Sequence, residues 1–425
     1  MTKSSFQPAP GDRRRRHETG VRRLGVLWIA ACLTACATGG SLSDPPPPSV
    51  PAPAVSPSPS PTPFQPVVPS PTASPTSTAA PTPTPTAYQT PPGGETLRSL
   101  ADAIGFGIGA PYLNPEARDS SFASLLRAEF NTAMMTTFMK KTEPERDSFD
   151  WGYSDAAARS ATEGGMAVIG GPLVYNNDTA PNWLGFGAAD CGSWPPDTLE
   201  GILRSYVETV VSRFAGRVSV WEVVNEPLTG ADNCWRRILG DEYIHRAFLY
   251  AHRADPDALL MLNEAFGREG VDPELTDRFM ALVRGIKDAG VPLDAVGIQM
   301  HLSLELLRPG YPDEFRYFLS RARRTGVEVM ITEMDVYQGP GGYFEDPFAV
   351  QAEAYGTIAR ICLETPYCTM LMTWGISDKF TWLLRIEGGT FEDPRPLLFD
   401  PAFERKPSYF AVRDALREAL AGGRR

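Results

Sequence analysis

Two stretches of the chain decide the fold: Trp221-Glu222-Val223-Val224-Asn225-Glu226-Pro227 and Val329-Met330-Ile331-Thr332-Glu333-Met334-Asp335-Val336. Each is a β-branched, apolar run that carries a Glu at its end, and Glu226 and Glu333 are 107 positions apart. In a (β/α)8 barrel the chemistry lies at the C-terminal ends of the strands, so different strands can aim their last residues at one site. The two stretches therefore predict strands of such a barrel, with both carboxyl groups at its mouth.

Two carboxyl groups about 5 Å apart are what a retaining glycosidase needs. One is protonated and helps the leaving sugar depart, and the other is ionised and attacks the anomeric carbon. A single Glu at a loop mouth is most often only a solvated carboxylate. Here Asn225 precedes Glu226, and neither run holds a Lys or Arg that could neutralise its Glu. The pair therefore predicts retaining glycosidase chemistry.

The rest of the domain shows a regular alternation of β-rich and helical segments. Eight short β-rich runs stand at 104–109, 130–135, 166–175, 218–225, 258–263, 295–301, 328–333 and 368–374. Segments with helical spacing lie between them, such as 121–129, 199–214, 273–289, 311–325 and 347–363. Such alternation favours a parallel sheet. We therefore predict an α/β fold, a (β/α)8 TIM barrel, over residues 93–425.

The first 35 residues have the pattern of a secretory signal. Basic residues, among them Arg13 to Arg16, precede an apolar run from Leu24 to Ala35 that is too short to span a bilayer. The run ends in Leu33-Thr34-Ala35-Cys36, which resembles the lipobox of bacterial lipoproteins. We expect lipidation at Cys36; an ordinary signal peptide, or twin-arginine export through Arg22-Arg23, is the alternative.

Residues 36–92 form a linker rich in Pro, Ser, Thr and Ala. Nineteen of the chain's 41 prolines lie between positions 41 and 92, so this segment cannot bury a core. Its composition predicts a disordered, extended spacer that holds the domain away from a surface. A ligand for a proline-binding module is the alternative.

Charge separates the possible partners. The chain carries a net charge of +5 through Cys36 and therefore −16 beyond it. An acidic exported domain repels phosphate backbones, so nucleic acid is not an expected partner, whereas a neutral glycan is indifferent to the field. We expect a monomer that is exported and held by its lipid at the bacterial cell surface or membrane.

Four cysteines remain after the signal and Cys36 are set aside, in an oxidising setting that favours disulfides. Cys362 and Cys368 close a short loop before a strand, which leaves Cys191 and Cys234 as a second pair that the sequence does not settle. A metal site is the alternative, but no cysteine has a CxxC partner and only four His exist. Neither a metal nor a cofactor is expected.

Several motifs together resemble glycoside hydrolase family 10, the endo-β-1,4-xylanase family. Besides the two Glu runs, the similar stretches are Val296-Gly297-Ile298-Gln299-Met300-His301-Leu302, Thr373 to Leu383, and Pro396 to Asp400 followed by Lys406-Pro407. The family's short-loop cysteine pair also matches Cys362 and Cys368. A strand that ends in Asn-Glu-Pro is shared by several barrel families, but four motifs in this order are specific.

The resemblance implies the roles of the central residues. Glu226 corresponds to the acid/base and Glu333 to the nucleophile, while His301 lies between Glu333 and Asp335 and orients the nucleophile. Burial and the second carboxylate should raise the pKa of Glu226. Asn225 would bind the 2-hydroxyl of the sugar that is cleaved.

Further residues are implied around this centre. Gln299 matches the family's partner of the acid/base, Trp374 and Trp382 would stack on sugar faces, and Lys140 would donate to sugar hydroxyls. Either Trp could instead belong to the core.

The pattern breaks on the glycone side. Where the family usually has Glu-Asn, a His and Trp-His, this chain has Thr136-Thr137, Gly171 and Tyr175-Asn176. The aromatic residue that usually follows the fifth strand is also displaced, in the run Asn263-Glu264-Ala265-Phe266. Tyr175 and Asn176 remain candidate substrate-binding residues, in a pocket that should be wider and less selective between pentose and hexose.

The sequence therefore predicts a retaining endo-acting glycoside hydrolase that cleaves β-1,4-xylosidic bonds in xylan-type plant polysaccharide. The same chemistry on another β-linked glycan or glycoside is the first alternative. A non-catalytic glycan-binding lipoprotein is the second, although binding alone does not require the full catalytic set.

Overall fold

The computed structural model describes residues 94–425 apart from 113–118, 231, 339–343, 386–392 and 425. The predicted signal segment 1–35, Cys36 and the linker 36–92 lie outside the described residues. Within the described part of the chain, no helix is both long and apolar enough to cross a membrane.

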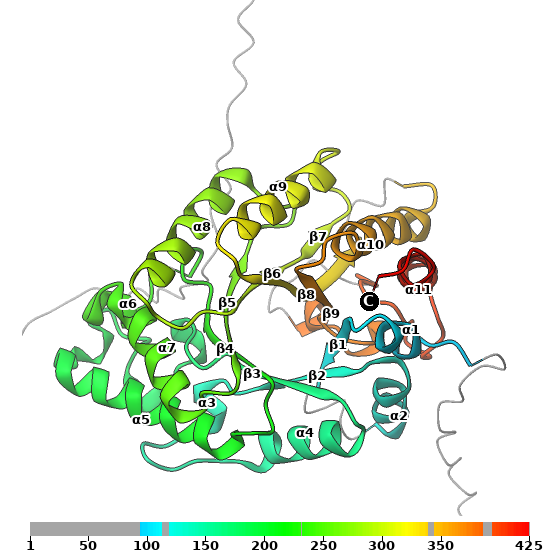
Figure 1. The fold of residues 1–425 in the computed structure, drawn as a ribbon. Coiled ribbons are helices and arrows are strands. Elements are labelled where there is room, and N and C mark those ends of the chain that lie inside the picture. Colours follow the sequence, from blue (N-terminus) through cyan, green and yellow to red (C-terminus); the bar gives the residue numbers. More distant parts are fainter. Residues whose placement is uncertain (1–93, 113–118, 231, 339–343, 386–392, 425) are drawn as a thin grey trace, which may run out of the picture. The chain divides into compact units, whose positions relative to one another are not determined.

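The strands form a closed parallel barrel, which confirms the predicted (β/α)8 fold (Figure 1). Neighbouring strands follow the chain order from β1 to β6, after which β6 pairs with β8, β8 with β9, and β9 with β1. The short β7 follows β6 directly and pairs with the end of β8. The strands are β1 Gly107–Pro111, β2 Thr132–Thr136, β3 Ala167–Gly171, β4 Val220–Asn225, β5 Leu259–Ala265, β6 Ala295–Gln299, β7 His301–Ser303, β8 Glu328–Tyr337 and β9 Cys368–Thr373.

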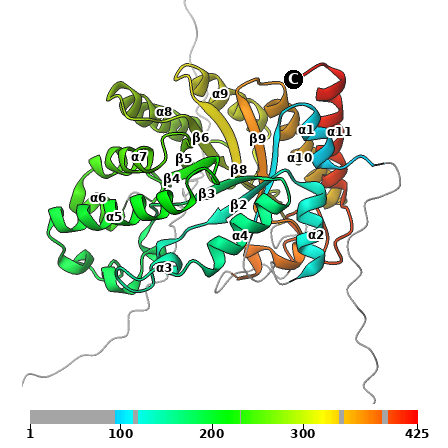
Figure 2. The same cartoon turned by 60° about the horizontal axis from the view of Figure 1, so that its bottom comes forward.

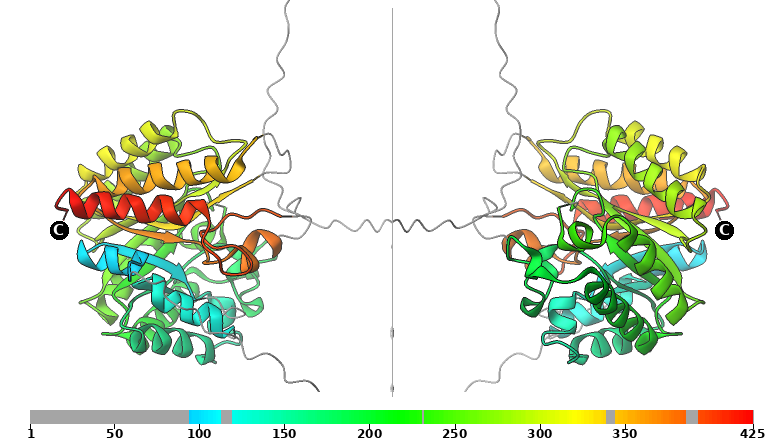
Figure 3. Two further views of the ribbon diagram at one scale, coloured as in Figure 1. Left: turned by 90° about the vertical axis from the view of Figure 1, so that its right-hand side faces the viewer. Right: turned by 90° about the vertical axis from the view of Figure 1, so that its left-hand side faces the viewer.

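The helices surround the barrel (Figures 1 and 2), and the side views show α10 and α11 running next to each other along its flank (Figure 3). They are α1 Leu97–Ala103, α2 Ser120–Glu129, α3 Met139–Thr142, α4 Gly152–Glu163, α5 Pro196–Phe214, α6 Cys234–Leu239, α7 Glu242–Ala254, α8 Pro273–Asp288, α9 Tyr311–Arg323, α10 Pro347–Leu363 and α11 Pro407–Ala421. Short 3-10 turns follow β3 and β9, at Asn177–Thr179, Asn182–Leu184, Cys191–Ser193, Asp378–Phe380 and Trp382–Arg385.

Local sequence explains where several helices begin. Asp272 accepts a hydrogen bond from the Leu275 amide, and Pro273 takes the first helical position, where its missing N–H costs nothing. Asp346 and Pro347 start α10 in the same way. These Asp-Pro pairs fix the first turns of α8 and α10.

The inside of the barrel is packed with side chains rather than open. Methionines dominate this inner cluster, because flexible unbranched side chains fill an irregular interior well. Its members are Met134, Ile169, Val220, Met261, Ala295, Met330, Met370 and Met372, with Trp374 packed against them. Trp374, which is partly buried, packs against this cluster, so the barrel interior holds no open channel among the described residues.

Two strand ends differ from the prediction. The run 166–175 was expected to be one strand, but β3 ends at Gly171, which has φ +143° and a cis bond to Pro172. A Cβ at Gly171 would lie only 2.5 Å from the Cβ of Glu222 on β4. Glu333 does not end its strand either, because β8 continues to Tyr337 by pairing with β7.

Two disulfides are present, the expected Cys362–Cys368 pair and the Cys191–Cys234 pair that the sequence left open. Cys362 and Cys368 close the loop between α10 and β9, with Cα atoms 5.2 Å apart. Cys191 and Cys234 are joined with a Cα separation of 5.5 Å and connect the long segment after β3 to the start of α6. The second bridge therefore ties together the two segments that follow Tyr175 and Glu226.

Candidate active site

Glu226 stands immediately beyond β4 in a sharp turn. Its backbone has φ +50°, a conformation that costs a non-glycine residue about 1–3 kcal/mol. The turn is held on both sides, because the Glu226 amide donates to the Asn263 carbonyl and the Glu226 carbonyl accepts from the Gly230 amide, each at 2.9 Å. The backbone therefore fixes the direction in which this carboxyl points.

The Glu226 carboxyl is partly buried and bound through one oxygen. Its Oε1 accepts a hydrogen bond from the Tyr175 hydroxyl at 2.7 Å and one from Gln299 Nε2 at 3.1 Å. Burial raises the pKa of Glu226 above its usual range, and the charge of Glu333 adds to the rise. The two hydrogen bonds and the charge of His301 act in the opposite direction. The net effect favours a carboxyl that carries a proton, as a general acid requires.

Glu333 projects from β8 and is 5% exposed. Each of its oxygens faces one partner: Asn263 Nδ2 donates to Oε1 at 2.9 Å, and His301 Nε2 lies 3.2 Å from Oε2. On the other side of the imidazole, His301 Nδ1 is 3.0 Å from Asp335 Oδ2. The same Asp335 oxygen accepts a hydrogen bond from Trp382 Nε1 at 2.7 Å. The predicted row of Glu333, His301 and Asp335 is thus present as contacts.

His301 is held as a cation in this row. Burial lowers the pKa of its imidazole, but Asp335 and Glu333 outweigh burial and raise that pKa to about 10. At neutral pH the imidazolium therefore lies between two carboxylates. Its positive charge lies beside Oε2 of Glu333, at 3.2 Å.

Amide side chains connect the two Glu residues. Gln299 Nε2 donates to Glu226 and, at 3.2 Å, to Asn225 Oδ1. Asn263 Nδ2 donates to Glu333 and, at 3.1 Å, to the same Asn225 oxygen. Asn225 therefore uses its oxygen within the protein, while its amide nitrogen has no hydrogen-bond partner among the described residues. That nitrogen is the group that can meet a sugar hydroxyl.

The predicted aromatic residues lie at the same site. Trp382 and Trp374 are half-buried, and their rings have centroids 5.0 Å and 6.4 Å from the His301 ring. Trp382 has a second function that the sequence did not reveal, because it donates to Asp335. Lys140, by contrast, is exposed on α3 and has no hydrogen bond or ion pair with the described residues.

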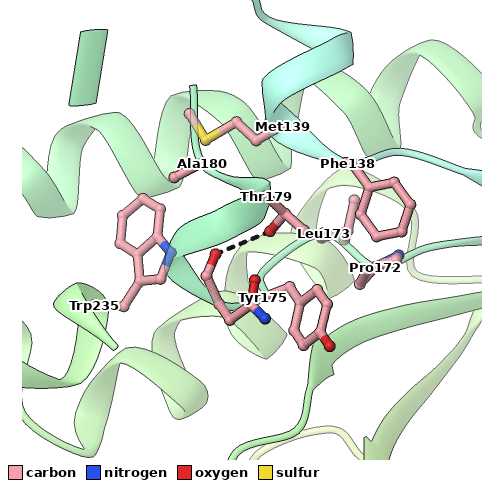
Figure 4. A pocket seen from close by; sticks show the side chains of 9 residues that line it. Phe138, Met139, Pro172, Leu173, Tyr175, Thr179, Ala180 and Trp235 are labelled. Carbon is pink, nitrogen blue, oxygen red and sulfur yellow. Dashed lines mark hydrogen bonds between the residues drawn. The ribbon is translucent and has the colours of Figure 1, made fainter. Parts of the chain in front are cut away.

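On the predicted glycone side, the hydroxyls of Thr136 and Thr137 form hydrogen bonds to other groups of the protein. Thr136 donates to the Tyr153 hydroxyl at 3.2 Å, and Thr137 donates to the Pro172 carbonyl at 3.1 Å. Both threonines are buried, at 7% and 0% exposure, so their hydroxyls are not directed at a substrate. Asn176 is partly buried, and its Oδ1 has no partner among the described residues. Tyr175 and Asn176 line a small hollow, together with Phe138, Met139, Pro172, Leu173, Thr179, Ala180 and Trp235 (Figure 4).

Sequence reasoning missed two buried carboxyl groups near the site. Glu222 is 1% exposed, and neither of its oxygens has a hydrogen-bond partner of normal geometry among the described residues. Burial and the charges of Glu333 and Glu226 raise its pKa well above the usual range. Glu264 accepts hydrogen bonds from the Leu228 amide at 2.8 Å and from the Thr229 hydroxyl. It thereby fixes the segment just after Glu226.

Asn263 was also missed, although its position at the end of the fifth predicted strand could have indicated it. It is completely buried, and Thr332 holds its oxygen at 2.8 Å so that its amide nitrogen faces Glu333. Among the described residues, no group of three or more His, Cys, Asp or Glu side chains is arranged to hold a metal ion.

Comparisons with known proteins agree with the resemblance seen in the sequence motifs. A family profile described as glycosyl hydrolase family 10 matches residues 96–415. The chain is 32% identical over 336 residues to endo-1,4-beta-xylanase B of Thermotoga neapolitana, covering 76% of this chain and 92% of that protein. It also matches the crystal structure of native xylanase 10B from Thermotoga maritima with a TM-score of 0.69 and 32% identity, over 77% of this chain and all of the other. Xylanase 10B from Thermotoga petrophila RKU-1 in complex with xylobiose gives a TM-score of 0.68 and 31% identity, over 77% and 98% of the two chains.

Proposed function

Because the chain belongs to glycosyl hydrolase family 10 and is therefore a glycoside hydrolase, we propose that it cleaves β-1,4-xylosidic bonds within xylan by a retaining double displacement. The observation that carries the proposal is the hydrogen-bonded chain Glu226, Gln299, Asn225, Asn263, Glu333, which gives each carboxyl its own set of donors. Two carboxyl groups with unlike surroundings are what the acid and the nucleophile require.

In the first step, Glu333 attacks the anomeric carbon while Glu226 gives its proton to the departing sugar oxygen. The C–O bond to the leaving group breaks, and an ester bond forms between the sugar and Glu333. Asn263 and His301 hold the two oxygens of Glu333 beforehand, so the attacking group does not need to be reoriented. The free amide nitrogen of Asn225 is available to the 2-hydroxyl, a contact that strengthens as the ring flattens.

In the second step, Glu226 takes a proton from water, and the resulting hydroxide displaces Glu333 from the sugar. The negative charge on Glu333 has disappeared in the ester, which removes one cause of the raised pKa of Glu226. Glu226 is then better suited to act as the base. Two inversions at the same carbon leave the anomeric configuration unchanged.

NMR of the first product released from a xylo-oligosaccharide tests the stereochemistry. We expect the β-anomer to appear first and to mutarotate later. Trapping with a 2-fluoro-glycoside followed by peptide mass spectrometry should place the label on Glu333. An initial α-anomer, or a label on another carboxylate, would contradict the proposal.

Hydrolysis of other β-linked glycans or glycosides by the same chemistry is a second candidate function. The small number of side-chain groups available to a substrate on the glycone side favours it. Thr136 and Thr137 direct their hydroxyls into the protein, and no side chain projects from Gly171. Fewer directional groups mean weaker rejection of a hexose or a branched sugar. Incubation of the enzyme with linear xylan, arabinoxylan and mixed β-glucans, with sizing of the products, separates the two candidates and distinguishes endo from exo cleavage.

For the cell, we propose a monomeric enzyme that is exported, lipidated at Cys36 and held away from the membrane by residues 37–92. The lipobox-like Leu33-Thr34-Ala35-Cys36 and the proline-rich composition support this proposal. Metabolic labelling with palmitate should mark the wild type but not Cys36→Ser. Unlabelled wild-type protein would reduce Cys36 to an ordinary residue of the signal. Sedimentation of the purified domain would test the monomeric state.

A further inference from the structure

We propose that Tyr175 is a positioning residue for the acid/base: with Gln299 it occupies Oε1 of Glu226 and so confines the catalytic proton to Oε2. The inference rests on the proposed function and adds a role for a residue that the sequence indicated only as a sugar contact.

The hydrogen bonds define which oxygen carries the proton. A carboxyl oxygen offers about two acceptor positions, and Oε1 of Glu226 already accepts from the Tyr175 hydroxyl and from Gln299 Nε2. Gln299 Nε2 can only donate, and the Tyr175 hydroxyl donates to no other described group. A proton on Oε1 would displace one of these donors. The proton is therefore carried by Oε2, which has no partner among the described residues.

The backbone keeps Tyr175 beside Glu226. After β3 ends at Gly171, the next residues still pair with β4: the Leu173 amide donates to the Glu222 carbonyl, and the Val174 amide to the Val223 carbonyl. The Asn225 amide donates back to the Val174 carbonyl at 2.9 Å. Tyr175 and Glu226 are thus the first residues beyond two paired segments, which sets the position of the hydroxyl relative to the carboxyl.

The residues around the Tyr175 ring are consistent with a hydroxyl that points toward Glu226. Tyr175 lies against Phe138, with ring centroids 6.4 Å apart. Figure 4 shows its hydroxyl pointing away from Met139 and Trp235, which line the other side of the hollow. Burial, followed by the nearby Glu226, raises the pKa of the Tyr175 hydroxyl, so it keeps its proton and remains a donor across the working pH range.

The proposed arrangement serves both steps. A hydrogen bond to a carboxylate favours the ionised form, so Tyr175 opposes the effect of burial on Glu226. Without this donor, Glu226 would hold its proton more tightly, and the proton could reside on either oxygen. Protonation of a poor leaving group would suffer, because Glu226 would be a weaker acid and its proton would be shared between its two oxygens.

The test compares Tyr175→Phe with wild type on two substrates. A xylo-oligosaccharide needs the proton of Glu226 to release its leaving sugar, whereas an aryl β-xyloside with a good leaving group does not. We expect kcat/KM to fall at least about tenfold on the oligosaccharide and to change less than about threefold on the aryl substrate. The basic limb of the kcat/KM profile on the oligosaccharide should move up by about one pH unit, because a donor to the ionised form is lost. Equal losses on both substrates with an unmoved limb would overturn the inference and make Tyr175 a sugar contact.

A matched control is Tyr153→Phe. Tyr153 also gives its hydroxyl to the protein, through the Tyr112 carbonyl, but it makes no hydrogen bond to Glu226. This variant should leave the pH profile unchanged; a shift equal to that of Tyr175→Phe would refute a specific role. Carbon-13 NMR titration of the Glu226 carboxyl in both variants reads the same pKa without turnover. If wild type is active but Tyr175→Phe shows neither the shifted pH profile nor the substrate-dependent loss, this inference alone is wrong. If wild type is inactive on every β-linked substrate, the proposed function is wrong.

Discussion

Replacing Asp335 by Asn should change how the stability of the enzyme depends on pH. Asp335 is completely buried and lies 3.0 Å from His301 Nδ1, and it is the main reason that the pKa of His301 is raised against the effect of burial. In the folded protein this pKa is about 10, compared with 6.5 for an unperturbed imidazole. Each unit of difference corresponds to about 1.4 kcal/mol, so the upper limit for His301 is about 5 kcal/mol.

Because the pKa of His301 is raised on folding, the stabilisation that it provides decreases as the pH rises. Because the folded protein binds the proton more tightly than the unfolded chain, the contribution is fully present below about pH 6.5 and is lost as the pH rises toward about 10. Glu333 supplies part of the shift, so we assign about 3 kcal/mol to Asp335. Wild type should therefore exceed Asp335→Asn in free energy of unfolding most strongly at pH 6, and this excess should shrink by about 3 kcal/mol by pH 10.

Urea unfolding of the active-site variants at several pH values measures this excess. Trp382→Phe is the control, because it removes a hydrogen bond to the same Asp335 oxygen but leaves the carboxylate charge in place. It should lower the free energy of unfolding by a similar amount at every pH. If the difference between wild type and Asp335→Asn is constant from pH 6 to pH 10, then His301 is not held as a cation and the reasoning is wrong.

Three further perturbations test separate parts of the structure. Lys406→Met leaves the buried Asp378 without its partner at 2.8 Å and should cost about 3–5 kcal/mol in urea unfolding at pH 7, with most of the loss recovered in a double variant that also carries Asp378→Leu. Burial raises the pKa of Glu264 from 4.5 to about 7, so the folded protein binds this proton more tightly than the unfolded chain. The free energy of unfolding of wild type should therefore fall by up to about 3 kcal/mol between pH 4.5 and pH 7, relative to that of Glu264→Gln. Parallel pH curves for the two proteins would contradict this. Gly171→Ala should lower the melting temperature through a loss of about 3 kcal/mol, since its Cβ would meet Glu222 in a backbone conformation that favours glycine, and an unchanged melting temperature would show that β3 adjusts freely.

Much of the barrel could be predicted because its strands are short apolar runs between segments with helical spacing. The prediction was wrong at the end of β3, where Leu173 and Val174 continue the apolar pattern although the strand has ended at Gly171. Both residues stay buried and still hydrogen-bond to β4 beyond the break at Gly171, so the apolar pattern alone does not locate this end. Helix α4 gives a weaker periodic signal, because its buried positions are small residues, such as Ala157, Ala158 and Ala161.

The site could be predicted to the extent that its residues lie in motifs. Short runs along the predicted strands indicated Glu226, Gln299, Glu333 and His301. The structure places Gln299 against Glu226 and His301 against Glu333. Asn263 was not indicated, because its function depends on facing Glu333 across 70 positions of sequence. The end of the fifth predicted strand indicated only that Asn263 lies near the rim, and the contact itself arises from barrel closure.

In the proposed double displacement, the donors around the two carboxyl groups explain how one site can serve both steps. That mechanism places the negative charge of the free enzyme on Glu333, whose two oxygens face Asn263 and His301. When Glu333 becomes an ester and Glu226 gives up its proton, the net charge of the cluster is unchanged, but the negative charge now lies on Glu226. Tyr175 and Gln299 are already in place to receive it. Because both sets of donors exist before the reaction, the charge moves between two prepared positions and the protein has little to reorganise, which is the condition for electrostatic stabilisation to lower a barrier.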